Sequence, residues 1–183
     1  SAPKLLREFG QGEPAKWWMM ISYPDANTYL QAQQLEEDPT FLEASKAYAS
    51  LPAEAPLFNR YTSQLLHAFT GMPEVAFPEV EAGLFELRTY EGYNEDAVRR
   101  KAAMFNDVEI DLFHRTGLHP VFFGKMLAGP VRPALVYMLH FKDMAERDAN
   151  WKTFFAHPEW KAMLQNPKFA NTVSNIHKTF LVP

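Results

Sequence analysis

Hydrophobic and polar positions along residues 84–183 follow the periods of strands and helices and predict one complete folding unit. Residues 84–91 alternate as a strand does, and Asn94 then offers the side chain that caps a helix. Apolar residues recur at helical spacing after this cap, at Val98, Ala102, Phe105, Val108 and Leu112. The expected later elements are a strand at 119–124, a strand from Leu135, a helix that restarts at Pro158, and a strand at 173–181.

A shorter version of this pattern precedes the complete one. The apolar run 17–23 corresponds to the run 135–141, and each leads into a helix. Both helices are interrupted by an X-Pro step, Asp38-Pro39 in one and His157-Pro158 in the other, where a new helix is expected to begin. We interpret the two stretches as an internal repeat. The order βαββαβ of the complete copy is typical of the ferredoxin-like fold and puts the chain in the α+β class.

The first copy begins at its second strand. Phe9-Gly10 matches Phe123-Gly124, and residues 63–65 match residues 174–176. The residues before Phe9 do not match the strand and helix that open the second copy. The expected organisation is therefore a partial repeat at 1–71, a linker at 72–83 and a complete repeat at 84–183. A sheet without its first strand has an open edge, and open edges are usually covered. We therefore expect a homo-oligomer.

Composition narrows the classes of function. The chain has 183 residues, 47% of them apolar and 22% charged, as in ordinary globular domains. Its net charge of −4 argues against binding nucleic acid, and the absence of cysteine excludes disulfides and thiolate chemistry. The apolar runs are shorter than the roughly 20 residues of a membrane span. We expect a soluble protein, either cytoplasmic or exported after removal of a signal peptide.

Two segments of the second copy resemble the NIPSNAP family. The strand at 85–90, with the sequence FELRTY, resembles the opening ELRxY strand of that family. Residues 144–147, Trp151 and the His157-Pro158-Glu159-Trp160 step resemble its helical segment. The resemblance covers residues 84–183, and residues 5–71 more loosely.

The resemblance implies a dimeric α+β barrel, in which two ferredoxin-like sheets face each other around a cavity. A tandem member is similar to such a dimer fused into one chain. The first copy lacks the ELRxY strand and has Thr40-Phe41 where the second has Glu159-Trp160, so a family site is expected in the second copy. The family as a class has no settled reaction, and the resemblance therefore implies a fold more firmly than a function.

Alternation along the strand at 84–90 suggests a ligand site. Phe85 and Leu87 are expected to face the helices, so that Glu86, Arg88 and Tyr90 point into the barrel. His140 on a neighbouring strand would complete a polar cluster within apolar walls, as ligand pockets have. The candidate ligand-binding residues are Glu86, Arg88, Tyr90, His119, Phe123, His140, Asn175 and His177. The structural alternative is that Glu86 and Arg88 form an ion pair that fixes the register of the sheets.

The histidines do not form a compact metal-binding motif, and we expect no metal and no cofactor. Haem is an alternative that the superfold suggests, because some dimeric α+β barrels bind it through one histidine. His119, His140 and His177 are the candidates for that role.

Three functions follow from these observations. The first is a protein that binds a small apolar or aromatic molecule in the barrel, or that acts as an interaction module. The second is an enzyme resembling the cofactor-independent monooxygenases of the same superfold, acting on an aromatic or enolisable substrate. In that reading His140 is the base, and Arg88 and Tyr90 hold the enolate or phenolate. The third is a haem protein.

Overall fold

The structure is a computed structural model that describes residues 2–10, 12, 14–78 and 82–183. The chain divides into two compact units, which are considered separately. One consists of the residues up to Lys4 together with Met20–Thr62, and the other of Leu5–Met19 together with Ser63–Pro183. Among the described residues, no helix has the length and apolar character needed to cross a membrane.

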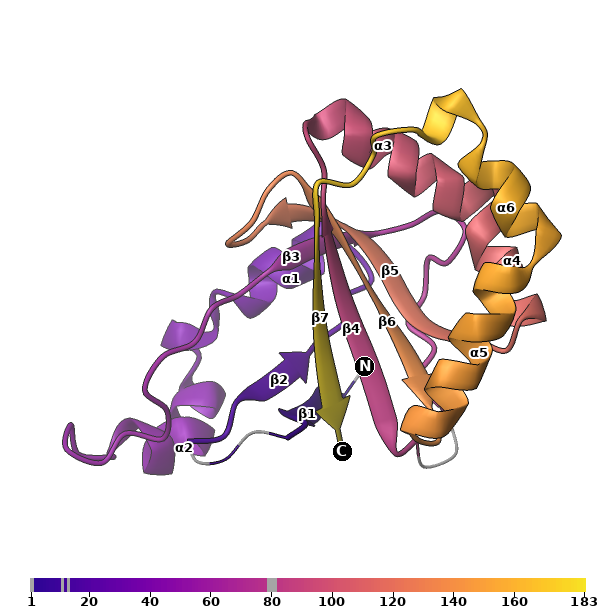
Figure 1. The fold of residues 1–183 in the computed structure, drawn as a ribbon. Helices are drawn as coiled ribbons and strands as arrows, with labels where there is room; N and C mark the ends of the chain where they lie inside the picture. Colours follow the sequence, from indigo (N-terminus) through magenta and orange to yellow (C-terminus); the bar gives the residue numbers. More distant parts are fainter. Residues whose placement is uncertain (1, 11, 13, 79–81) are drawn as a thin grey trace. The chain divides into compact units, whose positions relative to one another are not determined.

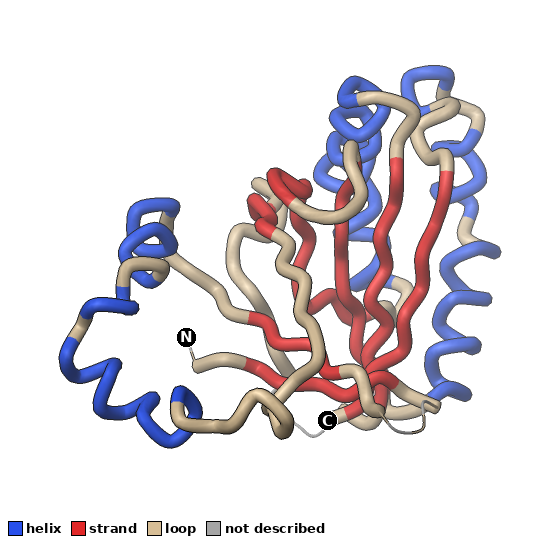
Figure 2. Tube along the Cα trace, turned by 90° about the vertical axis from the view of Figure 1, so that its left-hand side faces the viewer, coloured by secondary structure: helices blue, strands red, loops and turns tan. Residues whose placement is uncertain are grey.

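A curled seven-stranded sheet dominates the larger unit (Figure 2). The strands lie in the order β2-β1-β7-β4-β6-β5-β3, and the pairs β1–β7, β3–β5, β4–β6, β4–β7 and β5–β6 are antiparallel. Their bounds are β1 Lys4–Glu8, β2 Trp17–Met20, β3 Leu65–Ala68, β4 Leu84–Glu91, β5 His119–Ala128, β6 Ala134–Phe141 and β7 Asn175–Val182.

Helices cover one face of β4–β7 (Figure 1). They are α3 (Glu95–Met104), a π-helical turn (Phe105–Glu109), α4 (Ile110–Arg115), α5 (Met144–Ala156) and α6 (Pro158–Leu164), followed by a short 3₁₀ turn (Pro167–Phe169). The described order of strands and helices in 84–183 is β4-α3-α4-β5-β6-α5-α6-β7. The mixed α/β architecture expected from the sequence is therefore confirmed at this level.

Local signals in the sequence set where these helices begin. The Asn94 side chain accepts a hydrogen bond from the backbone N–H of Ala97, and the Asp143 side chain accepts one from Glu146. The Glu146 carboxylate accepts in return from the backbone N–H of Lys142, the residue before the cap. His157 caps α6 ahead of Pro158, the first residue of that helix. The cap expected at Asn94 and the helix restart expected at Pro158 are confirmed.

Aromatic rings fill the space between the helices and the sheet. Phe105, Phe113, Phe123, Tyr137 and Phe154 are fully buried. The Phe105 ring centroid lies 5.1 Å from that of Phe123 and 5.2 Å from that of Tyr137. Burial of five such rings supplies a large hydrophobic contribution and holds the helices against the sheet.

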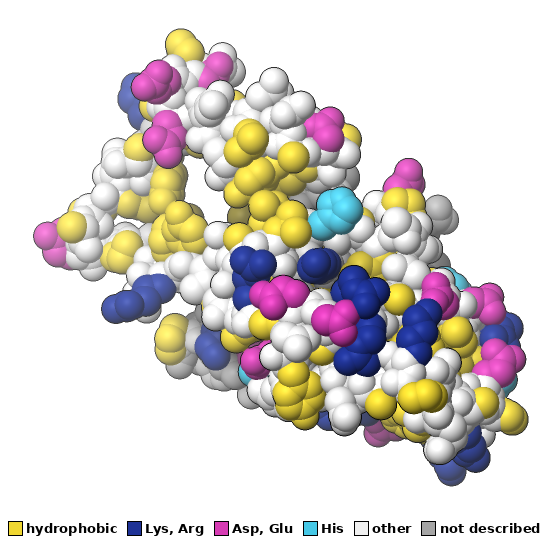
Figure 3. Space-filling model, turned by 90° about the horizontal axis from the view of Figure 1, so that it is seen from above, with side chains coloured by type: hydrophobic (Ala, Val, Ile, Leu, Met, Phe, Trp, Pro, Cys, Tyr) yellow, Lys and Arg dark blue, Asp and Glu magenta, His cyan; other side chains and the backbone are white. Residues whose placement is uncertain are grey.

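The smaller unit has a different character. Its helices are α1 (Ala26–Ala32) and α2 (Pro39–Ala49), joined by a 3₁₀ turn (Leu35–Glu37), and none of them has a buried residue. Asp38 caps α2 ahead of Pro39, as the X-Pro step predicted. Apolar side chains lie at the surface here, Leu57 being 73% exposed and Tyr61 78%. Figure 3 shows several such side chains at the molecular surface.

Candidate functional site

A buried ionic network joins β4 to α5. The Glu86 carboxylate is fully buried and accepts hydrogen bonds from Arg88 Nη1 at 2.6 Å, from Arg147 Nε at 2.9 Å and from Trp151 Nε1 at 2.9 Å. Arg147 and Trp151 belong to α5. The side chain of Glu86 thus points toward the helices and is matched by three donors, as a buried carboxylate requires.

The predicted orientation of β4 is therefore wrong. Phe85 and Leu87 were expected on the helix side, but it is Glu86 and Arg88 that contact α5. Phe85 and Leu87 are nevertheless buried, at 2% and 6% exposure. Because both faces of this strand are buried, hydrophobicity alone could not tell which face the helices cover. The donors on α5 decide it.

The network continues along the strand through two tyrosines. Arg88 Nη2 donates to the Tyr90 hydroxyl at 3.0 Å, and the Tyr90 and Tyr137 hydroxyls lie 2.9 Å apart. The Arg88 guanidinium also lies 4.7 Å from the centroid of the Trp151 ring, a cation–π distance. Arg88 Nε is buried without a hydrogen-bond partner among the described residues, so the guanidinium keeps one donor unused.

A second buried ion pair lies on the helices opposite. Lys101 Nζ is 2.5 Å from Glu109 Oε1, and the two side chains are 6% and 3% exposed. Lys101 Nζ also lies 4.6 Å from the centroid of the Phe105 ring. Glu109 closes the π-helical turn Phe105–Glu109. Such turns widen a helix by one residue and occur often at functional sites.

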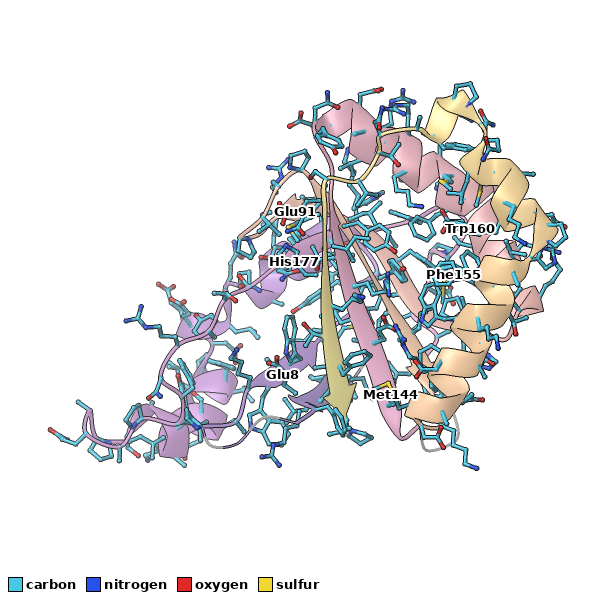
Figure 4. The ribbon with its side chains drawn as sticks, viewed as in Figure 1. Glu8, Glu91, Met144, Phe155, Trp160 and His177 are labelled. Carbon is cyan, nitrogen blue, oxygen red and sulfur yellow. The ribbon has the colours of Figure 1, made fainter. Side chains whose placement is uncertain are left out.

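Several members of the two networks line a cavity of about 400 Å³ between the sheet and the helices. Its charged lining residues are Arg88, Lys101 and Glu109, and its hydroxyls come from Tyr90, Tyr137 and Thr172. The apolar wall includes Trp151, Phe154, Phe155, Trp160, Leu164 and Phe169. Figure 4 shows Phe155 on α5 and Trp160 on α6, the helices that pack against the sheet. The volume lies within the usual range for small-molecule sites, roughly 300–1,000 Å³.

The two carboxylates differ in their environment. Burial favours the neutral form of Glu86, but the hydrogen bonds from Arg147 and the charge of Arg88 outweigh it, so the pKa of Glu86 lies below its ordinary value. Burial dominates at Glu109 despite Lys101, and the pKa of Glu109 is raised. Burial also raises the pKa of Tyr137 well above its ordinary value. Glu86 is thus a fixed anion, whereas Glu109 is the carboxyl group able to take up a proton.

The remaining predicted residues do not join this cluster. His119 on β5 pairs with His140 on β6, and their rings stack with centroids 5.2 Å apart. His140 also pairs with Phe85 on β4, so its side chain lies on the same sheet face as that of Phe85. They therefore lie on the sheet face opposite Glu86. The prediction that His140 clusters with Glu86, Arg88 and Tyr90 is wrong, because strand alternation puts His140 on the opposite face of the sheet.

Three further candidates also lie outside the cavity. Asn175 and His177 are exposed and contact Glu91, which Figure 4 shows beside His177 on the neighbouring strand. Phe123 is a core residue that stacks on Tyr137 at 5.2 Å. Of the predicted ligand residues, only Arg88 and Tyr90 line the cavity, while Glu86 holds Arg88 in place.

Lys101, Glu109 and Tyr137 were missed from the sequence. Lys101 stands between Val98 and Ala102 on the apolar stripe of its helix, and Glu109 follows Phe105 by one turn. A charged residue in an apolar stripe needs a buried partner, and these two are eight residues apart on nearly the same side of a helix. That pattern was the available signal.

Within the described residues there is no group of three or more His, Cys, Asp or Glu side chains that could hold an ion. The described residues that line the cavity include no histidine, so none of the three haem candidates lies in it.

Comparisons with known proteins place the chain among its relatives. No curated protein matches it. A NIPSNAP family protein of unknown function from Agrobacterium tumefaciens has a similar structure, with TM-score 0.50 and 19% identity over 59% of this chain and 94% of that one. A NIPSNAP-like domain protein from Burkholderia xenovorans gives TM-score 0.49 and 19% identity, over 57% and 87%.

A third structure extends over almost the whole chain. It is a protein named "Putative monooxygenase" from Fusobacterium nucleatum, with TM-score 0.52 and 7% identity over 98% of this chain and 74% of that one. At such identities the likeness concerns the fold alone. The sequence model of the NIPSNAP family matches residues 85–183, more than half of the chain. The chain therefore belongs to the NIPSNAP family.

Proposed function

We propose that the chain binds a small aromatic or apolar molecule carrying an acidic group in the cavity between the sheet and α3–α6. The observation that carries this proposal is the convergence of Arg88, Lys101 and the Tyr90–Tyr137 hydroxyl pair on one aromatic-lined space. Ligand pockets have this composition, with apolar walls and a few polar groups that fix orientation.

The charges of the lining favour an anion. Arg88 and Lys101 are cations, whereas Glu109 is the single acidic group among the described lining residues, and its pKa is raised. A carboxylate, phenolate or enolate on the ligand would face the Arg88 guanidinium and compete with Glu109 for Lys101. The aromatic wall would pack against the rest of the ligand.

The test uses two probes of the same shape, 1-naphthoate and the uncharged 1-naphthylmethanol. Binding is measured by quenching of tryptophan fluorescence, since Trp151 and Trp160 line the cavity. We expect naphthoate to bind at least about tenfold more tightly than the alcohol, a difference of about 1.4 kcal/mol. Equal affinities would refute the part of the proposal that requires an acidic group on the ligand.

A matched pair of variants tests the location. Leu164 lines the cavity and is 55% exposed, so Leu164→Trp adds bulk at the wall with little expected cost to folding. Leu127 is 46% exposed on β5 and does not line the cavity, and Leu127→Trp is the control. Naphthoate binding should be lost only in Leu164→Trp. Loss in both variants, or in neither, would place the ligand elsewhere.

A second candidate function is oxidation of an enolisable aromatic substrate by O₂ without a cofactor. The specific observation in its favour is Glu109, a cavity carboxyl group whose pKa is raised by burial and which could remove a proton. Anthrone is the probe: Glu109 would take its benzylic proton, the carbanion would give electrons to O₂, and anthraquinone and water would result. Glu109→Gln should slow anthraquinone formation at least about tenfold. An equal rate in both proteins would refute this function.

We also propose that residues 1–71 and 84–183 are two ferredoxin-like repeats joined by the linker 72–83. The strand order β7-β4-β6-β5 within 84–183 supports this, because β4 lies between the last and the third strand of its unit, as in βαββαβ folds. Residues 1–71 supply the three remaining strands, β1, β2 and β3. In this proposal the seven strands of the two repeats form one incomplete α+β barrel within a single chain.

A further inference from the structure

Lys101 places a buried primary amine at the wall of the cavity. The residue is only 5% exposed, and lysine is rarely so buried unless it has a partner. Its side chain lines the cavity between the sheet and the helices. A molecule bound there would therefore lie beside an amino group, which is a nucleophile whenever it is neutral.

Three aromatic rings surround this amino group. Nζ of Lys101 lies 4.6 Å from the ring centroid of Phe105, 5.7 Å from that of Tyr90 and 5.8 Å from that of Trp160. Tyr90 and Trp160 line the cavity as well. Walls of this kind pack against an aromatic ligand and keep water away from the group that reacts.

The partner of Lys101 is a carboxyl group that can exchange a proton with it. Nζ lies 2.5 Å from Glu109 Oε1, and the two side chains are 6% and 3% exposed. Burial raises the pKa of Glu109 despite the cation beside it. Transfer of one proton from Nζ to Oε1 turns the ion pair into a neutral pair and removes two buried charges at once. The neutral pair is an amine beside an acid, the combination that imine formation needs.

We propose that Lys101 is a nucleophile that forms an imine with an aromatic aldehyde bound in the cavity, with Glu109 as the acid and base of the reaction. This inference rests on the cavity of the proposed function, but it requires no acidic group on the ligand. It also differs from the oxidation of an enolisable substrate, because no oxidant takes part.

The steps balance without a further reactant. Neutral Nζ attacks the carbonyl carbon, the N–C bond forms, and the carbonyl oxygen takes the proton of the Glu109 carboxyl group. The nitrogen returns a proton to Glu109, which passes it to the new hydroxyl group. That group leaves as water while the nitrogen lone pair forms the C=N bond. The product is an iminium ion beside the Glu109 carboxylate, so the charges of the original ion pair are restored.

The test traps the imine in the 183-residue chain. 1-Naphthaldehyde is added with sodium cyanoborohydride, which gives hydride to the iminium carbon and leaves a stable secondary amine that peptide mapping locates. We expect Lys101 to be labelled at least about tenfold faster than the exposed Lys142, because binding in the cavity raises the local concentration of the aldehyde. Propanal has the same reactive group without the ring, and it should show no preference for Lys101.

Two variants show whether the aldehyde reaches Lys101 through the cavity. Leu164→Trp adds bulk at the cavity wall and should abolish labelling of Lys101 while leaving that of Lys142 unchanged. Leu127→Trp is the control, at an exposed residue that is not among the described residues lining the cavity, and should change neither. Labelling confined to exposed lysines, or equal labelling of Lys101 in both variants, would overturn the proposal.

The outcomes also separate this proposal from the proposed acidic ligand. If naphthoate binds in the cavity but naphthaldehyde does not label Lys101, the anion site is supported and the nucleophile is refuted. If naphthaldehyde labels Lys101 but naphthoate binds no more tightly than naphthylmethanol, the imine site is supported and the need for an acidic group is refuted.

Discussion

The two faces of β4 are both buried but are built differently. On the helix side, Glu86 and Arg88 belong to a network in which each charge has partners on a strand or on α5. On the opposite side, Phe85 packs beside His140, which stacks on His119. Only the helix side borders the cavity, through Arg88 and Tyr90.

The difference supports placing the proposed ligand on the helix side of β4. Buried ions remain charged only where donors surround them, and a fixed arrangement of such donors also presents oriented groups to a ligand. Among the described residues the histidine face has no such set of donors. Burial lowers the pKa of His140, and His119 adds to the effect. For this reason the proposed ligand site lies on the helix side, and the histidine pair is treated as part of the packing.

The largest effect is expected from Glu86→Gln, which removes the anion shared by two arginines. The variant should lose about 4 kcal/mol in the free energy of unfolding, because Arg88 stays buried beside a neutral amide. Urea denaturation measures the loss. The exposed Glu74→Gln is the matched control and should leave the midpoint unchanged. If Glu86→Gln lost little free energy of unfolding, the ionic network would contribute little to stability, and the two faces of β4 would not differ in this respect.

Removal of the second ion pair should have the next largest effect. Lys101→Met leaves Glu109 buried without its cation and should cost about 3 kcal/mol, less than the full penalty because Glu109 can take up a proton. The double variant with Glu109→Gln should recover part of the loss. If the double variant is as unstable as Lys101→Met, the loss comes from packing of the lysine stem rather than from the charge.

A single hydroxyl group tests the far end of the network. Tyr137→Phe removes the 2.9 Å contact with the Tyr90 hydroxyl while keeping the aromatic ring, and should cost about 1 kcal/mol. It should also weaken naphthoate binding if this hydroxyl orients the ligand. Tyr93→Phe, at a residue 65% exposed, controls for loss of a tyrosine hydroxyl elsewhere. Unchanged stability and binding in Tyr137→Phe would show that the contact between the Tyr90 and Tyr137 hydroxyls contributes to neither.

The smallest expected effect is a dependence of the stability on pH that comes from His140. The pKa of His140 is lowered in the folded protein from 6.5, so below that pH the unfolded chain binds more protons than the folded one. Stability should therefore fall as the pH drops through 6.5, and this part of the fall should disappear in His140→Gln. Thermal unfolding from pH 8 to 5 measures it, with His114→Gln as the control for loss of an exposed histidine. An unchanged profile in His140→Gln would contradict this.

Much of the fold of 84–183 followed from local signals in the sequence. Asn94, Asp143 and His157 cap the helices that were expected, and the strands lie where alternation placed them, although β5 continues to Ala128 and the last strand begins at Asn175. Caps and periodicity act over a few residues, so a single sequence contains them. The π-helical turn at Phe105–Glu109 was not predicted, because helical spacing alone does not reveal one extra residue in a turn.

The candidate site was half predicted. Alternation correctly grouped Glu86, Arg88 and Tyr90 on one face of a strand, and the structural alternative of a Glu86–Arg88 ion pair describes a contact that is present at 2.6 Å. The wrong side was chosen because charged residues were expected away from the helix layer. Tyr137, Lys101 and Glu109 come from other elements and could be joined to this set only by the packing of α3 and β6 against β4.

The sequence by itself determined the element order, the helix starts and the family resemblance, since these depend on neighbours within a few residues or on a matching motif. The tertiary structure alone decided which face of β4 the helices cover and which charges meet. Glu86 and Trp151 are 65 residues apart in sequence, and their 2.9 Å hydrogen bond exists only once α5 has packed on the sheet. Burial of a charge depends on such distant partners, and therefore the site was set by packing.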